Sequence, residues 1–120
     1  MPGGRVAQLT RARESDTRRR AAELRHLTSD GQPIGPELPD DHPWHPRTRA
    51  WWDTWRRSPM ARAFHPLDWD HLALAAVMHS RMWDGELSAA AEVRMWSAKF
   101  GGTPVDRMRL RWVAHEEYSL

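Results

Sequence analysis

The eight tryptophans of this 120-residue chain all lie at or after residue 44. The first 43 residues contain no Trp, Phe or Tyr. Because aromatic side chains supply much of the area that a small domain buries, this distribution predicts where the chain folds. We expect a packed core after residue 44 and little independent core before it.

Shifts in composition predict the domain organisation. The first 31 residues are rich in arginine, and between residues 10 and 20 only Ala12 is apolar, so no apolar face could dock on a core. Five of the nine prolines fall in residues 32–46, where they remove backbone donors and favour extended conformations. We predict a disordered or frayed basic arm (1–31), a proline-rich linker (32–46), a helical oligomerisation core (47–113) and a C-terminal tail (114–120).

Start and stop signals predict four short helices in the core. Pro66 suits the first position of a long helix that Gly85 would end, and Thr103-Pro104 forms a cap and first position for the last helix. No strand pattern competes with these signals. The predicted fold class is all-α, a short bundle or hairpin of about four helices over residues 47–57, 66–84, 87–99 and 104–113.

Charge changes sign along the chain. Residues 1–26 carry seven arginines against three acids, residues 27–43 carry four acids and no Lys or Arg, and residues 44–120 have a net charge of +2. Guanidinium groups suit phosphate contacts, and a basic arm gains affinity for nucleic acid by counterion release. The arm is either a solvated tail or a DNA-binding segment, and helical arginines are a second possible surface. The candidate DNA-binding residues are Arg11, Arg13, Arg18, Arg19, Arg20, Arg25, Arg56 and Arg57.

The second and third predicted helices are apolar on two faces. Such a helix must be covered twice, either by the core of its own chain or by a neighbouring subunit. For a core this small we favour a homo-oligomer. The candidate interface residues are Trp69, Leu74, Met78, Met82, Trp83, Val93 and Trp96.

Catalytic and metal sites are not predicted. The chain has no cysteine, which excludes disulfides, thiolate metal sites and thiol nucleophiles. His42 and His45 have a loose ligand spacing but lack a third ligand, and Gly101-Gly102 lacks the Lys-Ser/Thr of a phosphate loop. We therefore expect no enzyme, no cofactor, no metal and no small-molecule substrate.

Localisation is predicted from what the sequence lacks. No apolar run approaches the roughly 20 residues of a membrane helix, and the start MPGGRVAQLTRAR lacks the apolar core of a signal peptide. We expect a cytoplasmic protein with no membrane partner.

Three segments resemble a known family. They are WHPRTRAWWDTWRRSPMA (44–61), DWDHLALAAVMHSRMWDG (68–85) and EVRMWSAKFGGTPVDRMRLR (92–111). Their marks are Trp-Trp-x-x-Trp before Arg-Arg-Ser-Pro, Asp-Trp opening a long helix, and Lys-Phe-Gly-x-Thr-Pro-x-Asp-Arg before a basic helix. Over more than half of the chain, this pattern resembles the terminase small subunit of tailed phages and prophages of actinobacteria.

The resemblance implies a non-enzymatic, all-α, ring-forming protein. It would recognise double-stranded viral DNA for packaging and present it, in the host cytoplasm, to the large terminase subunit, which carries the ATPase and nuclease. Many terminase small subunits bind DNA through an N-terminal helix-turn-helix, for which residues 1–43 have too few apolar side chains. Two alternatives stay open: a small dimeric DNA-binding regulator with a basic arm, and a protein-interaction module that binds no DNA.

Overall fold

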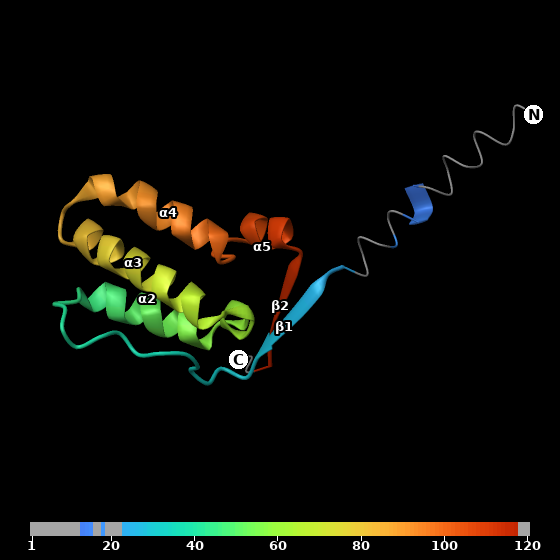
Figure 1. The fold of residues 1–120 in the computed structure, drawn as a ribbon, viewed down its shortest axis with the longest axis horizontal. Helices are drawn as coiled ribbons and strands as arrows, with labels where there is room; N and C mark the ends of the chain where they lie inside the picture. The colour runs from blue at the N-terminus through green and yellow to red at the C-terminus, as the bar shows by residue number, and fades with distance from the viewer. Residues whose placement is uncertain (1–12, 16–17, 19–22, 118–120) are drawn as a thin grey trace, which may run out of the picture.

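A computed structural model of the chain describes residues 13–15, 18 and 23–117. Figure 1 shows α3 beside both α2 and α4, with α5 and a pair of strands near the end of α4. The elements of the described part are β1 (Arg25–Ser29), α2 (Pro46–Arg57), the 3-10 turn η1 (Pro59–Ala63), α3 (Pro66–Trp83), the 3-10 turn η2 (Leu87–Ala89), α4 (Ala90–Lys99), α5 (Pro104–Leu110) and β2 (Trp112–Glu116).

Local signals account for the ends of the helices. Proline occupies the start of α2, α3 and α5, where its missing N–H costs nothing. Before α5, Thr103 Oγ1 accepts from the Asp106 N–H, and the Asp106 carboxylate accepts from the Thr103 N–H. After α3, Gly85 adopts a φ of 115°, which favours glycine. The four predicted helices are confirmed, except that the last one ends at residue 110.

The all-α prediction is confirmed only in part: the fold is mostly helical, but β1 and β2 form a parallel two-stranded sheet. The register runs from Arg25 opposite Trp112 to Ser29 opposite Glu116. Arg111 adopts the left-handed conformation, with a φ of 59°, and so ends α5 and allows β2 to follow. The paired segments are 87 residues apart, so no local sequence pattern predicts the sheet.

The strands also change how the two ends of the chain are described. Most of the arm predicted over residues 1–31 lies outside the described residues, but its last part contains β1, in which Leu27 and Ser29 are buried. β2 likewise occupies residues that we expected to be the end of a helix and a tail. The basic arm stays a prediction, and its predicted end at residue 31 overlaps β1.

The core is aromatic, as the tryptophan distribution predicts. Trp44, Trp52, Trp55 and Trp69 form one buried cluster with Leu72 and Phe100. The rings of Trp52 and Trp69 lie 5.4 Å apart and tilted, an arrangement that aromatic pairs favour over face-to-face stacking. Among the described residues, Leu27 is the one buried hydrophobic residue that precedes residue 44.

Candidate functional site

Residues 30–44, here named the strap, lie against α2. The indole N–H of Trp52 in α2 donates to Pro36 O at 2.9 Å, and within the strap the indole N–H of Trp44 donates to Pro39 O at 2.7 Å. Leu38 packs against the buried cluster. The strap has no regular secondary structure, yet these contacts make it part of the folded unit.

Two candidate DNA-binding arginines hold the strap. Arg56 donates from Nε to Ile34 O and from Nη2 to Gly35 O, both at 3.1 Å. Arg57 donates from Nη1 to Gly31 O at 2.8 Å. Hydrogen bonds from a charged donor are stronger than neutral ones, so both guanidinium groups have a structural role in this fold.

The other candidate arginines belong to the N-terminal part of the chain. Arg11, Arg19 and Arg20 lie outside the described residues, whereas Arg13, Arg18 and Arg25 are exposed. The backbone N–H of Arg25 donates to Arg111 O at 2.8 Å where β1 begins. DNA binding by these residues stays a prediction.

A buried histidine joins α2 to α3. The Trp83 indole N–H donates to His79 Nε2 at 3.3 Å, so Nδ1 carries the proton that is donated to Thr48 Oγ1 at 2.7 Å. The ring of Trp51 stacks on His79 with 4.5 Å between centroids. Burial, and secondarily the charge of His45, lowers the pKa of His79 from 6.5 to about 4. His79 is therefore neutral at neutral pH and serves as a packed residue.

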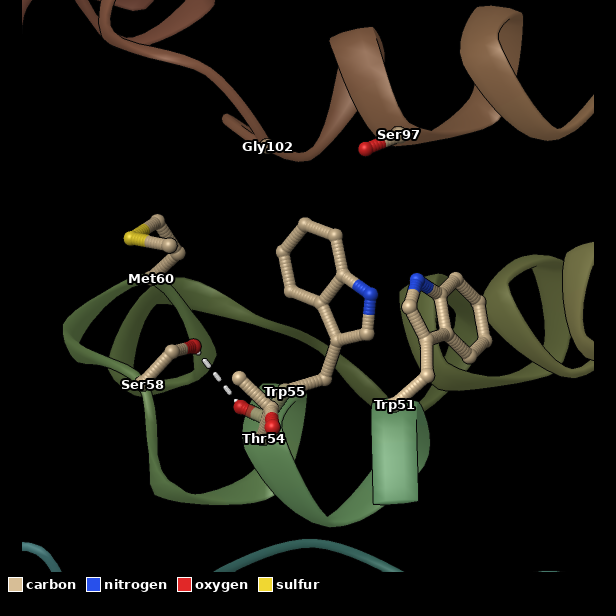
Figure 2. A pocket seen from close by; sticks show the side chains of 7 residues that line it. All are labelled: Trp51, Thr54, Trp55, Ser58, Met60, Ser97 and Gly102. Atoms are coloured by element: carbon tan, nitrogen blue, oxygen red, sulfur yellow. Dashed lines mark hydrogen bonds between the residues drawn. The ribbon is translucent and has the colours of Figure 1, made fainter. Parts of the chain in front are cut away.

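A pocket of about 180 Å³ opens between α2 and the end of α4 (Figure 2). Two of its donors are indole N–H groups, because Trp51 and Trp55 place their nitrogens on facing edges of the two rings, and the Ser97 hydroxyl also lines the pocket. Neither N–H donates to an acceptor among the described residues, where no fully buried polar side-chain atom lacks a partner. The Trp55 N–H must therefore be reached from the pocket. The lining residues are Trp51, Thr54, Trp55, Ser58, Met60, Ser97 and Gly102.

The apolar surface of α3 is partly covered within the chain, whereas Leu67 and Leu74 stay exposed. α2 packs on one part of its surface and α4 on another, and Trp96 of α4 stacks on His71 of α3 with 5.1 Å between centroids. This packing accounts for part of the apolar surface from which we predicted a subunit interface. Trp69 lies in the core of the single chain.

The remaining interface candidates differ in exposure. Leu74 and Trp83 are exposed, although the Arg47 guanidinium lies 4.3 Å from the Trp83 ring centre. Met78 and Met82 of α3 and Val93 and Trp96 of α4 are half-buried. An interface formed by these residues stays a prediction.

Sequence reasoning missed one contact between two histidine side chains. His26 Nδ1 and His115 Nε2 lie 2.8 Å apart across the sheet, and only the unpredicted pairing of β1 with β2 brings them together. In the described residues no group of three or more His, Asp or Glu side chains could hold a metal ion. None of the helices described is both long and apolar enough to cross a membrane.

The described part of the chain is thus a small, mostly helical protein with a tryptophan core and an aromatic pocket. A family model described as phage terminase small subunit matches residues 3–118. The chain belongs to the phage terminase small subunit family, which confirms the resemblance in the sequence. Searches of curated proteins and of solved structures gave no match.

Proposed function

We propose that this protein recognises the double-stranded DNA of a tailed phage or prophage and presents it, as a ring-shaped homo-oligomer, to the large terminase subunit in the host cytoplasm. The family match over residues 3–118 supports this proposal. Terminase small subunits are generally non-catalytic, because the ATPase is in the large subunit. The protein would therefore act by binding.

The DNA contacts are assigned to the N-terminal arginines. The observation that supports this choice is the engagement of Arg56 and Arg57 with strap carbonyls. A guanidinium that already donates to the fold has fewer donors for phosphate. In a ring, each copy adds one arginine-rich segment, so the segments would act together and raise the avidity.

The test replaces arginines and keeps β1. A deletion of residues 1–30 would remove the strand that buries Leu27 and Ser29, so it would disturb the fold as well. The better variant changes Arg11, Arg13, Arg18, Arg19 and Arg20 to Gln. We expect affinity for DNA of the packaging region to fall about tenfold or more and the salt dependence to flatten, since fewer counterions are released. Fluorescence anisotropy at several salt concentrations measures both quantities.

A matched control changes exposed helical arginines instead. The variant carries Arg49→Gln, Arg81→Gln, Arg94→Gln and Arg109→Gln, all at exposed positions. It should retain most of the affinity. The opposite pattern, with loss only in the control, would move the DNA surface to the helices. An unaltered chain without salt-sensitive binding would favour the protein-interaction alternative.

The oligomer is tested separately. Light scattering of the unaltered protein should give a mass several times the 14.0 kDa of one chain. A dimer would favour the small DNA-binding regulator. A monomer at all concentrations would contradict the ring.

A further inference from the structure

An exposed leucine lies near one end of α4 and a pocket near the other. At the start of α4 the turn η2 carries Leu87, which is 78% exposed. At the other end, Ser97 and Gly102 line the pocket of Figure 2. The ten residues of α4 separate the two features by about 15 Å. Figure 1 shows the α3–α4 turn at the end of the helical core opposite α5.

The pocket suits an apolar side chain that is accompanied by a backbone carbonyl. Trp55 is only 6% exposed, and its N–H reaches the pocket beside the N–H of Trp51. Buried indole N–H groups normally have an acceptor, and a carbonyl oxygen has two lone pairs that could accept from both. No Lys or Arg lines the pocket, so it offers no charge for a phosphate.

The size of the pocket points to one aliphatic group. Its volume of about 180 Å³ is several times the roughly 30 Å³ that one water occupies in the liquid. That is room for a leucine side chain. Met60 and the faces of the two indoles supply apolar contact for it.

Charge complementarity indicates a second copy as the occupant. The turn and first helical residues, 84–92, carry Asp84, Glu86 and Glu92 and no Lys or Arg. The C-terminal end of α3 adds a negative partial charge there. Residues 97–111, at the pocket end, carry Lys99, Arg107, Arg109 and Arg111 against one acid, Asp106.

We propose that Leu87 of one copy inserts into the Trp51–Trp55 pocket of the next copy. The contact is head-to-tail, because each copy uses two different surfaces. Such heterologous contacts build rings when the rotation closes. This inference rests on the proposed homo-oligomer and assigns to it a surface other than the α3 and α4 faces predicted from the sequence.

The first experiment separates Leu87 from other exposed leucines. Leu87→Asp places an acid in the apolar pocket, so the mass by light scattering should fall to the 14.0 kDa of one chain. The control is Leu67→Asp, at a position that is 63% exposed on α3 but distant from the turn. The control should keep the mass of the unaltered protein.

The second experiment changes the pocket. Ser97→Phe fills the space from α4 and should also give monomers. Trp55→Phe keeps an aromatic ring and removes one N–H, so the protein concentration needed for assembly should rise. This variant tests the pocket even if Ser97→Phe disturbs folding. Circular dichroism and thermal unfolding show whether each variant is folded.

The decisive experiment mixes the two monomeric variants. Leu87→Asp keeps an intact pocket, and Ser97→Phe keeps an intact Leu87. A head-to-tail contact therefore predicts one productive contact per pair, and so a dimer with twice the mass of one chain and no larger species. A contact in which both copies use the same surface predicts no such rescue.

The outcomes distinguish this inference from the proposed function. An unaltered protein that is monomeric contradicts the ring itself. An oligomer that survives both Leu87→Asp and Ser97→Phe overturns the head-to-tail contact and leaves the ring standing. Monomeric variants that fail to form the dimer on mixing also overturn it.

Discussion

The strap and α4 are attached to the rest of the fold in two different ways. The strap has no regular structure, yet indole and guanidinium donors from α2 hold its carbonyls, and Trp44 at its end is buried. α4 is a regular helix of ten residues in which no residue is fully buried. The comparison teaches that regular secondary structure and anchoring to the core are separate properties.

Trp52→Ala should give the largest effect, because Trp52 belongs to the core and also holds the strap. The variant loses a buried aromatic side chain and the hydrogen bond to Pro36 O. We expect the free energy of unfolding to fall by about 3–5 kcal/mol, measured by denaturant titration. The matched change in α4, Met95→Ala at a 44% exposed position, should cost no more than about 0.5 kcal/mol. Similar costs for both variants would remove the distinction between the two regions.

Lowering the pH should have a smaller effect on the free energy of unfolding, through the contact of His79 with the start of α2, where the strap ends. His79 contacts Thr48 in the first turn of α2, and its pKa is lowered to about 4 in the folded protein. Between pH 6.5 and pH 4, His79 binds a proton in the unfolded chain but not in the folded chain. The free energy of unfolding should therefore fall as the pH falls through this window. The contribution is fully present above pH 6.5, and its complete loss amounts to roughly 3 kcal/mol.

Denaturant titration at several pH values measures this slope. His79→Gln cannot titrate, so its stability should depend less on pH in the same window, although it should be less stable than the unaltered chain at pH 7. An unchanged slope in this variant would show that other groups cause the pH dependence.

The smallest effect should come from Arg56→Lys. Lysine keeps the charge but cannot donate to Ile34 O and Gly35 O with the fork of a guanidinium. We expect a loss of about 1 kcal/mol in the free energy of unfolding and faster hydrogen exchange in residues 31–38. Arg94→Lys on the exposed surface of α4 is the control and should change neither quantity.

Sequence reasoning succeeded where the cause is local. Proline at the first helical position, the Thr103–Asp106 capping box and Gly85 after α3 each act within a few residues, so the helices could be located from the sequence. The tryptophan distribution located the core because burying large aromatic rings is favourable wherever they meet. The family could be predicted for the same reason, because the resemblance rests on short sequence segments.

Sequence reasoning failed for the candidate site where distant groups meet. The sequence indicated Arg56 and Arg57 only as candidate DNA-binding residues and gave no sign of their hydrogen bonds to strap carbonyls more than 20 residues earlier. The pocket likewise needs α2 and the end of α4 to come together. Neither arrangement leaves a periodic pattern in the sequence.

Local signals and composition were enough to predict the helices, the aromatic core and the terminase small subunit family, because these features depend on residues that are close together in the chain or on their overall distribution. Only the folded structure shows that β1 pairs with β2, that α2 and α4 pack on different parts of α3, and that the indoles of Trp51 and Trp55 share one pocket. The physical reason is that hydrogen bonds and burial depend on which groups meet in space, and residues far apart in the chain meet only after it has folded.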